Sequence, residues 1–202
     1  MSRRVVLASG NQGKLRELQA LLAPSGYVCM AQSEFNVPEV PEDGLSFVEN
    51  ALIKARNACR YTGLPAIADD SGLEVTALDG RPGIYSARFA GSGATDADNT
   101  RKLLDELAAM DNPDRSARFV CALVYMAHAQ DPVPEICVGT WSGTIIQQPR
   151  GENGFGYDPV FQVAGLRLTS AELDAAEKNR LSHRASALAC LAERLGQRTD
   201  AD

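Results

Sequence analysis

The chain has 202 residues, of which 45% are hydrophobic and 23% charged, a composition typical of a globular protein whose core needs no disulfide or metal. The formal net charge of −6 argues against a nucleic-acid polymer or an anionic membrane as the main partner, although a local group of cations can still bind a small anion. The five cysteines lack a C-x-x-C spacing, which indicates reduced thiols and a cytoplasmic protein, and no apolar run is long enough to span a membrane.

The N-terminal segment predicts a strand, a glycine-containing turn and a helix. Residues 4–8 read as a buried strand, and residues 12–22 carry leucines at helical spacing. The turn between them, SGNQGK, offers glycines that let a ligand approach the backbone, free N–H groups at a helix start, and a lysine. It is not the P-loop pattern, so it is either another kind of phosphate-binding turn or a plain turn with a solvated lysine.

The next segment predicts a strand at 27–30, an acidic, proline-rich loop at 36–44 and a helix at 46–61. Ser46 and Glu49 have the spacing of a capping box at the start of that helix. Asn50, Lys54 and Asn57 recur at i, i+4 and i+7 and form a polar stripe. That stripe is either a solvated face or a face turned toward a ligand.

The stretch PAIADDSGLEVTAL, residues 65–78, predicts a short strand, an acidic turn and a second strand. Adjacent residues of an extended chain point to opposite sides, so at most one of Asp69 and Asp70 faces a given cleft. A carboxylate there can hold Mg²⁺ or deprotonate a bound water. The alternative is a turn that caps itself through Asp70 or Ser71.

The second half of the chain predicts a glycine-rich loop at 80–93, a helix at 96–110, two strands at 117–128 and 134–146, and a final helix at 182–195. The two strands are joined by a short turn and can form a hairpin. Arg88 in the glycine-rich loop is a further candidate phosphate contact. Helices that alternate with strands, together with a hairpin, predict an α/β fold with a mixed sheet.

Two polar clusters in this half are candidates for ligand binding. In GENGFGYDPVF, two aromatic residues flank Gly156, and an aromatic face can stack on a base, although one of the pair can instead fill the edge of the core. Asp158 can accept a hydrogen bond. Ser182 as N-cap places His183 and Arg184 in a first helical turn, where cations oppose the helix dipole, and this indicates a ligand-facing role.

Six blocks carry a resemblance to a known family. In chain order they are SGNQGK, FVENALIKA, AIADDSGLEV, PGIYSARFAG, GFGYDPVF and SHR. The sequence resembles the non-canonical purine nucleoside triphosphate pyrophosphatases, also called inosine triphosphate pyrophosphatases or XTP/dITP diphosphatases. The resemblance implies one domain over residues 1–202, with an elongated mixed sheet, flanking helices and two lobes around a central cleft, usually as a homodimer. It also implies Mg²⁺-dependent hydrolysis of ITP, dITP or XTP to the monophosphate and pyrophosphate.

The resemblance further implies roles for individual residues. Asp70 is the expected proton acceptor and takes part in metal binding, with Ser71 beside the substrate. The expected contacts to the triphosphate are Ser9, Gly10, Asn11, Gln12, Gly13 and Lys14. The expected contacts around the nucleotide, chiefly its base, are Phe155, Gly156, Tyr157, Asp158, Lys178, His183 and Arg184.

The chain departs from the family at one acidic motif. The family often has E-E-T-G before the helix that holds the E-N-A block, whereas this chain has Pro41-Glu42-Asp43-Gly44. Glu42 is assigned as the second metal ligand, with Glu49 as a rival. Three alternative functions stay open: a related pyrophosphatase for another base such as a modified pyrimidine, a nucleotide-binding regulator without hydrolysis, and a structural dimer module. The last leaves the glycine-rich loops without a purpose.

Overall fold

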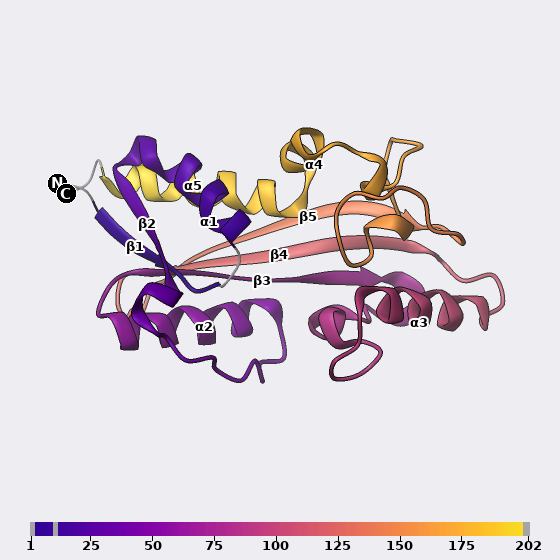
Figure 1. The fold of residues 1–202 in the computed structure, drawn as a ribbon, viewed down its shortest axis with the longest axis horizontal. Coiled ribbons are helices and arrows are strands. Elements are labelled where there is room, and N and C mark those ends of the chain that lie inside the picture. Colours follow the sequence, from indigo (N-terminus) through magenta and orange to yellow (C-terminus); the bar gives the residue numbers. More distant parts are fainter. Residues whose placement is uncertain (1–2, 10–11, 200–202) are drawn as a thin grey trace. The chain divides into compact units, whose positions relative to one another are not determined.

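The computed structural model describes residues 3–9 and 12–199. Within them six strands form one sheet in the order β2-β1-β3-β4-β5-β6 (Figure 1). β1 pairs in parallel with β2 and with β3, whereas β5 and β6 are antiparallel, so the predicted mixed sheet is confirmed. The strands are β1 (Arg3–Leu7), β2 (Tyr27–Ala31), β3 (Ala66–Val75), β4 (Ser116–Met126), β5 (Glu135–Ile145) and β6 (Phe161–Val163).

The helices predicted at 12–22, 46–61, 96–110 and 182–195 are present. The described helices are α1 (Gln12–Leu22), α2 (Phe47–Thr62), α3 (Asp96–Ala108), α4 (Ala175–Leu181) and α5 (His183–Thr199). The expected cap of α2 is present, because Ser46 Oγ accepts a hydrogen bond from Glu49 N at 3.2 Å and the Glu49 carboxylate accepts one from Leu45 N at 2.9 Å. None of the described helices is long and apolar enough to cross a membrane.

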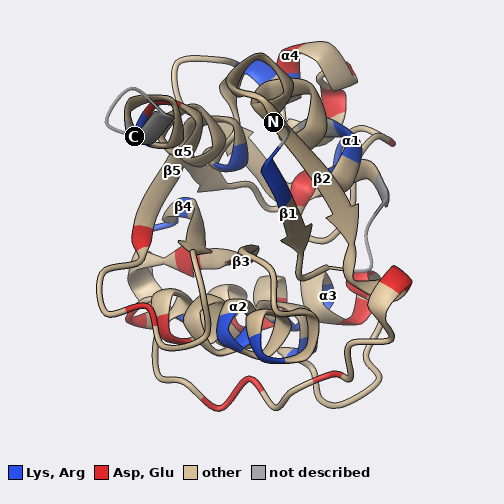
Figure 2. Ribbon diagram, turned by 90° about the vertical axis from the view of Figure 1, so that its left-hand side faces the viewer, with Lys and Arg blue, Asp and Glu red and all other residues tan. Residues whose placement is uncertain are grey.

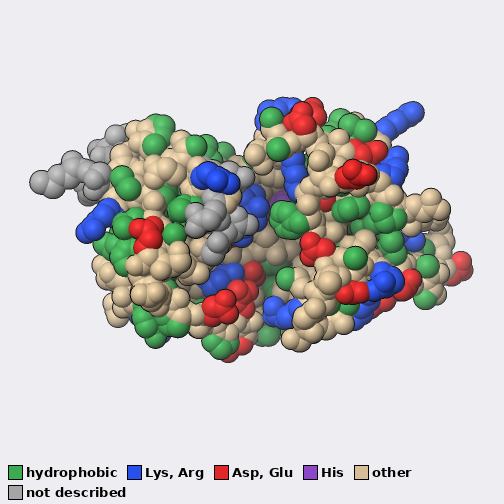
Figure 3. Space-filling model, in the orientation of Figure 1, with side chains coloured by type: hydrophobic (Ala, Val, Ile, Leu, Met, Phe, Trp, Pro, Cys, Tyr) green, Lys and Arg blue, Asp and Glu red, His purple; other side chains and the backbone are tan. Residues whose placement is uncertain are grey.

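The chain divides into two compact units. The first comprises Met1–Asp70, Cys121–Gly139 and Ser186–Asp202, and the second comprises Ser71–Val120 and Thr140–Ala185. Each unit has its own core. On the face shown in Figure 3, acidic and basic side chains of the described residues are interspersed.

The core of the first unit lies on both faces of its strands. Figures 1 and 2 show α1 and α5 on one side of β1 and α2 on the other. Neighbouring residues serve opposite faces: Ile67 packs in the cluster that includes residues of α1 and α5, whereas Ala66 and Ala68 pack with the alanines of α2. This alternation is the ordinary pleat of a strand buried on both sides.

The core of the second unit is built around aromatic rings of the sheet. The centroid of the Phe119 ring lies 4.6 Å from that of Phe161, and the Trp141 centroid lies 5.6 Å from Phe161. Leu103 and Leu107 of α3 belong to the same buried cluster. Such tilted aromatic pairs add to the stability that burial of their area already provides.

The predicted acidic turn at residues 69–72 is wrong. Residues Ala66–Val75 form one continuous strand of ten residues, so Asp70 and Ser71 lie inside β3 rather than in a turn. The two aspartates are tolerated in the strand because each reaches a lysine, Lys14 for Asp69 and Lys54 for Asp70. Their opposite orientation, expected from the pleat, is confirmed, because these lysines come from α1 and α2.

Candidate active site

A cluster of charged side chains in the first unit joins three parts of the chain. Lys54 Nζ of α2 lies 3.2 Å from Asp70 Oδ1 of β3 and 3.2 Å from Glu42 Oε1. Glu42 belongs to the connection that precedes α2, and Figure 2 shows the acidic residues of this connection next to the basic residues of the helix. The two carboxylates therefore converge on one positive charge.

The environment of Asp70 favours proton acceptance. Burial raises the pKa of the Asp70 carboxyl above its usual value, and the negative charge of Glu42 acts in the same direction. The Lys54 ammonium and a hydrogen bond from Asn50 oppose this shift without cancelling it. A carboxylate with a raised pKa is a stronger base than an ordinary surface aspartate.

Asn50 ties this cluster together. The side chain is fully buried, its Nδ2 donates to Asp70 Oδ2 at 3.2 Å, and its Oδ1 accepts from Gly44 N at 2.9 Å. Gly44 follows Glu42 closely, so one amide holds both the acidic connection and the catalytic candidate. Of the polar stripe on α2, Asn50 and Lys54 thus face Asp70, whereas Asn57 Nδ2 donates to Pro38 O.

The rival carboxylate, Glu49, has a different neighbourhood. Its Oε2 accepts hydrogen bonds from Leu45 N at 2.9 Å and from Ser46 Oγ at 2.8 Å. These bonds close the N-terminus of α2. The geometry therefore favours Glu42 over Glu49 as the partner of Asp70.

The opposite face of β3 carries another ion pair of the first unit. Lys14 Nζ of α1 lies 2.6 Å from Asp69 Oδ2, and Asp69 is only 5% exposed. Ser9 follows β1, and Gly13 is in the first turn of α1. Of the other predicted phosphate contacts, Gly10, Asn11 and the side chain of Gln12 lie outside the described residues.

In the second unit, Asp158 is the centre of the loop that was predicted to receive the base. The carboxylate is 3% exposed and accepts hydrogen bonds from Phe155 N and from Ser170 Oγ, each at 2.8 Å. It also pairs with Lys178, whose ammonium lies 4.9 Å from the centre of the Phe155 ring. Asp158 thus fixes both the loop and the lysine.

The two aromatic residues of this loop have different positions. Phe155 is 64% exposed, whereas Tyr157 is 4% exposed and donates its hydroxyl hydrogen to Ser86 O at 2.8 Å. The expectation that one of the pair fills the core is confirmed, and it is Tyr157. Burial raises the pKa of Tyr157, which keeps the hydroxyl protonated as a donor.

His183 is supported by two aromatic residues that the sequence did not single out. Its ring stacks on Phe119 of β4, with centroids 5.0 Å apart and planes 16° apart, and on Trp141 of β5 at 6.5 Å. Ser182 Oγ accepts a hydrogen bond from Ala185 N at 3.2 Å, which places His183 and Arg184 in the first turn as predicted.

Two other predicted residues have simpler surroundings. Ser71 Oγ is buried and makes no hydrogen bond to the described part of the chain. Arg88 is exposed, and its guanidinium lies 5.3 Å from the centre of the exposed Tyr85 ring.

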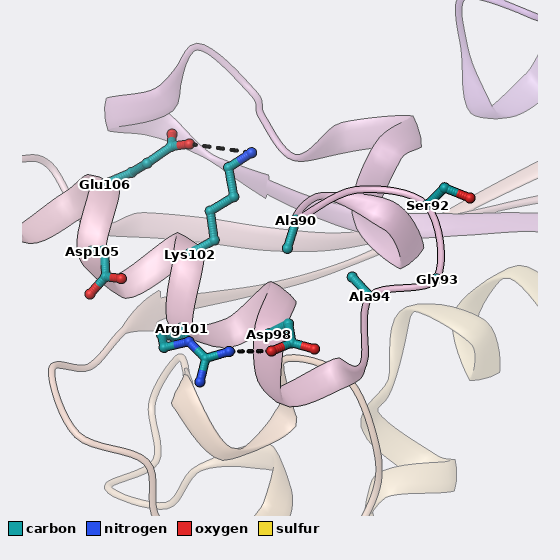
Figure 4. Close-up of a pocket in the computed structure, with 9 residues that line it drawn as sticks. All are labelled: Ala90, Ser92, Gly93, Ala94, Asp98, Arg101, Lys102, Asp105 and Glu106. Atoms are coloured by element: carbon teal, nitrogen blue, oxygen red, sulfur yellow. Dashed lines mark hydrogen bonds and ion pairs between the residues drawn. The ribbon is translucent and has the colours of Figure 1, made fainter.

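A separate pocket of about 540 Å³ lies between α3 and the loop at residues 90–94 (Figure 4). Four of its charged side chains form pairs: Arg101 pairs with Asp98, and Lys102 Nζ lies 3.9 Å from Glu106. None of the predicted site residues lines it. This pocket is therefore distinct from both clusters described above.

Comparison with known proteins identifies the family. Residues 5–194 match the sequence pattern of the Ham1 family. The chain belongs to the Ham1 family. This Ham1 chain is 57% identical to the dITP/XTP pyrophosphatase of Thioalkalivibrio sulfidiphilus, over 95% of its own length and 98% of the relative's. It is 58% identical to the dITP/XTP pyrophosphatase of Vibrio cholerae, over 92% of its length and 93% of the relative's.

Solved structures agree with this assignment. The HAM1 protein from Coxiella burnetii superposes on the chain with a TM-score of 0.94 and 51% identity, covering 96% of the chain and 99% of that protein. A protein from Mycobacterium abscessus is described as a nucleoside-triphosphatase and dITP/XTP pyrophosphatase. It has a TM-score of 0.80 and 43% identity, and the match covers 93% of the chain and 97% of that protein. The mixed sheet with flanking helices is therefore the Ham1 fold.

Proposed function

We propose that this protein is a nucleoside triphosphate pyrophosphatase that removes non-canonical purine nucleotides from the cellular pool. It hydrolyses ITP, dITP and XTP to the monophosphate and pyrophosphate. The observation that carries the proposal is the convergence of Glu42 and Asp70 on Lys54, in a chain 57% identical to a dITP/XTP pyrophosphatase over nearly its whole length. The Asp70 carboxylate at this convergence is partly buried, and burial raises its pKa, which suits it to accept a proton during hydrolysis.

The two carboxylates fit a divalent cation, for which we propose Mg²⁺. They already share one cation, the Lys54 ammonium, at 3.2 Å from each. Among the described residues no group of three or more His, Cys, Asp or Glu side chains is arranged to hold a metal, and Mg²⁺ commonly uses one or two carboxylates together with substrate phosphates. When bound by Glu42 and Asp70, the ion would neutralise charge on the phosphate oxygens.

Asp70 accepts the proton of the water that attacks the substrate. The water oxygen attacks the α-phosphorus, the bond from that phosphorus to the bridging oxygen of the β-phosphate breaks, and pyrophosphate leaves. The proton of the water passes to the Asp70 carboxylate, whose raised pKa suits it to accept that proton. Asn50 fixes the orientation of the carboxylate by its bond to Oδ2.

Two lysines and the turn before α1 balance the charge of the triphosphate. Lys54 stands beside Asp70, and Lys14 is held by Asp69 on the other face of β3. Backbone N–H groups at the start of α1 add a positive field toward an anion. These groups stabilise the charge that develops on the leaving pyrophosphate.

We propose that the second unit recognises the base. The exposed Phe155 ring offers a stacking face, and Lys178, His183 and Arg184 offer donors. A 6-keto purine presents an acceptor oxygen where adenine presents a donor amine. Protein donors therefore form hydrogen bonds with the oxygen of a 6-keto purine. With adenine, a protein donor would face the donor amine, so ATP is rejected.

A pyrophosphate-release assay tests the function. We expect turnover of ITP, dITP and XTP at rates far above that of ATP, with activity lost in EDTA and restored by Mg²⁺. A modified pyrimidine triphosphate in the same panel tests the alternative of a related pyrophosphatase, which would hydrolyse this nucleotide faster than ITP. Nucleotide binding without pyrophosphate release would contradict the enzyme and favour the alternative of a nucleotide-binding regulator.

Two further parts of the proposal concern the state of the protein in the cell. We propose a cytoplasmic homodimer. Light scattering after size exclusion is expected to give twice the chain mass of 21.6 kDa. A mass equal to that of one chain at working concentration contradicts the dimer.

A further inference from the structure

Helix α3 grips the backbone of the loop that carries Phe155. Asp96 Oδ2 accepts a hydrogen bond from Gly156 N at 2.7 Å, and Thr100 Oγ1 donates one to Gly156 O at 3.2 Å. Asp96 and Thr100 are four residues apart, so they lie on the same face of the helix. Both main-chain polar groups of Gly156 are thus engaged by one helix.

These two hydrogen bonds hold the residue directly after Phe155. Gly156 has φ +60, a left-handed conformation that suits glycine. On the other side of Phe155, Asn153 N donates to Ala171 O at 3.0 Å, and Phe155 N itself donates to Asp158. The backbone around Phe155 is therefore fixed on both sides while its ring remains 64% exposed.

This arrangement keeps the Phe155 ring exposed in a fixed position rather than burying it in the core. An exposed aromatic side chain on a free loop loses conformational entropy when it stacks on a ligand, and a loop fixed beforehand avoids much of that loss. The Lys178 ammonium, 4.9 Å from the ring centre, lies against the same side chain. The ring is thus exposed on a fixed backbone, with a cation beside it.

We propose that Asp96 and Thr100 are positioning residues for base recognition, because they hold Gly156 so that Phe155 presents its face to the purine. This inference rests on the proposed function and adds α3 to the groups that serve it. Both residues act through the main chain of Gly156 rather than by contact with the nucleotide. Loss of either hydrogen bond lets the loop shift, which weakens base binding and leaves the phosphate chemistry of Asp70 in place.

The test uses the full chain with two disruptive variants, two conservative ones and a control. Thr100→Val removes the hydroxyl at nearly constant volume, and Asp96→Ala removes the acceptor. Thr100→Ser and Asp96→Asn retain a hydroxyl and an acceptor oxygen, and are expected to restore wild-type behaviour. Asp105→Ala removes an exposed acid of the same helix that makes no side-chain bond to the loop among the described residues.

For Thr100→Val and Asp96→Ala we expect KM for ITP to rise about threefold to tenfold, the value of one ordinary hydrogen bond, with kcat within about twofold of wild type. Affinity for IMP, measured by calorimetry, falls by the same factor, whereas affinity for inorganic tripolyphosphate is unchanged. Thermal unfolding of each variant checks that it folds.

Two results overturn the inference: an unchanged KM for ITP and affinity for IMP in both disruptive variants, or an equal loss of IMP and tripolyphosphate affinity. The second result indicates a general structural defect. Failure of wild type to release pyrophosphate from ITP contradicts the proposed function instead, and the IMP and tripolyphosphate measurements still decide the role of α3.

Discussion

Replacement of Asp70 by asparagine tests the chemistry most directly. The two side chains have nearly the same shape, so the change removes the negative charge, and with it the proton acceptor and an anionic ligand of the proposed Mg²⁺, at nearly constant volume. In the wild-type chain, Lys54 Nζ points to one oxygen of Asp70 and Asn50 Nδ2 to the other, each at 3.2 Å. Asparagine has one acceptor oxygen, so either orientation of its amide leaves one of these donors facing an NH₂ group.

The expected magnitude follows from these contacts. A positioned general base contributes about 10² to 10⁴ in rate, so kcat for ITP at saturating Mg²⁺ should fall by about that factor. Stability should change little, because loss of one hydrogen bond costs about 1 kcal/mol and relief of the buried charge acts in the opposite direction. Binding of ITP should be largely retained.

The assay measures pyrophosphate release together with ITP binding and thermal unfolding. Asp69→Asn is the comparison, because Asp69 occupies the next position but faces Lys14 on the opposite side of β3. It should raise KM more than it lowers kcat. A kcat for Asp70→Asn within tenfold of wild type would refute the role of this carboxylate as proton acceptor.

Three further predictions follow. Burial raises the pKa of Asp70 in the folded state above the ordinary 3.8, so its contribution to stability is present below that value and lost as the pH rises through the raised pKa. Urea unfolding in EDTA should therefore show wild type losing stability relative to Asp70→Asn as the pH rises from about 4, and the opposite trend contradicts the shift. Arg184→Ala should lower kcat/KM for ITP about tenfold to a hundredfold, the value of a charged hydrogen bond, and equal losses for ITP and ATP would show that Arg184 does not read the base. Gly154→Ala should lower the melting temperature more than Gly165→Ala: both have φ near +80, but only at Gly154 would a Cβ overlap Asp158. Equal shifts for the two variants contradict that close approach.

Much of the fold could be predicted because its signals are local. The leucine spacing predicted a helix over 12–22, which is the extent of α1, and Ser46 with Glu49 predicted the start of α2. The turn at Asp69–Gly72 was predicted wrongly for a related reason. Asp, Ser and Gly favour turns when only neighbours count, whereas the lysines that stabilise the two aspartates within β3 are 55 and 16 residues away in the chain.

In the candidate site too, the sequence indicates which residue types matter but not which residues they contact. The sequence singled out Phe155 and Tyr157 together, but only three-dimensional packing makes one exposed and the other part of the core. From the sequence Glu42 was assigned as the metal ligand with Glu49 as a rival; the structure adds that Glu42 lies beside Lys54, whereas Glu49 caps α2. The support of His183 by Phe119 and Trp141 joins three distant elements and leaves no local pattern.

The position of Asp70 is decided by strand register. β1 and β3 pair in parallel with Val6 opposite Ala66 and Leu7 opposite Ile67, which fixes the side of the sheet that each later residue of β3 faces. A slip of one residue would exchange the two aspartates and turn Asp70 from Lys54 toward Lys14. The apolar residues that set this register are fully buried or nearly so, at 0% for Val6, Ala66 and Ile67 and 3% for Leu7. The orientation of the proposed proton acceptor is therefore a consequence of core packing at the start of the same strand.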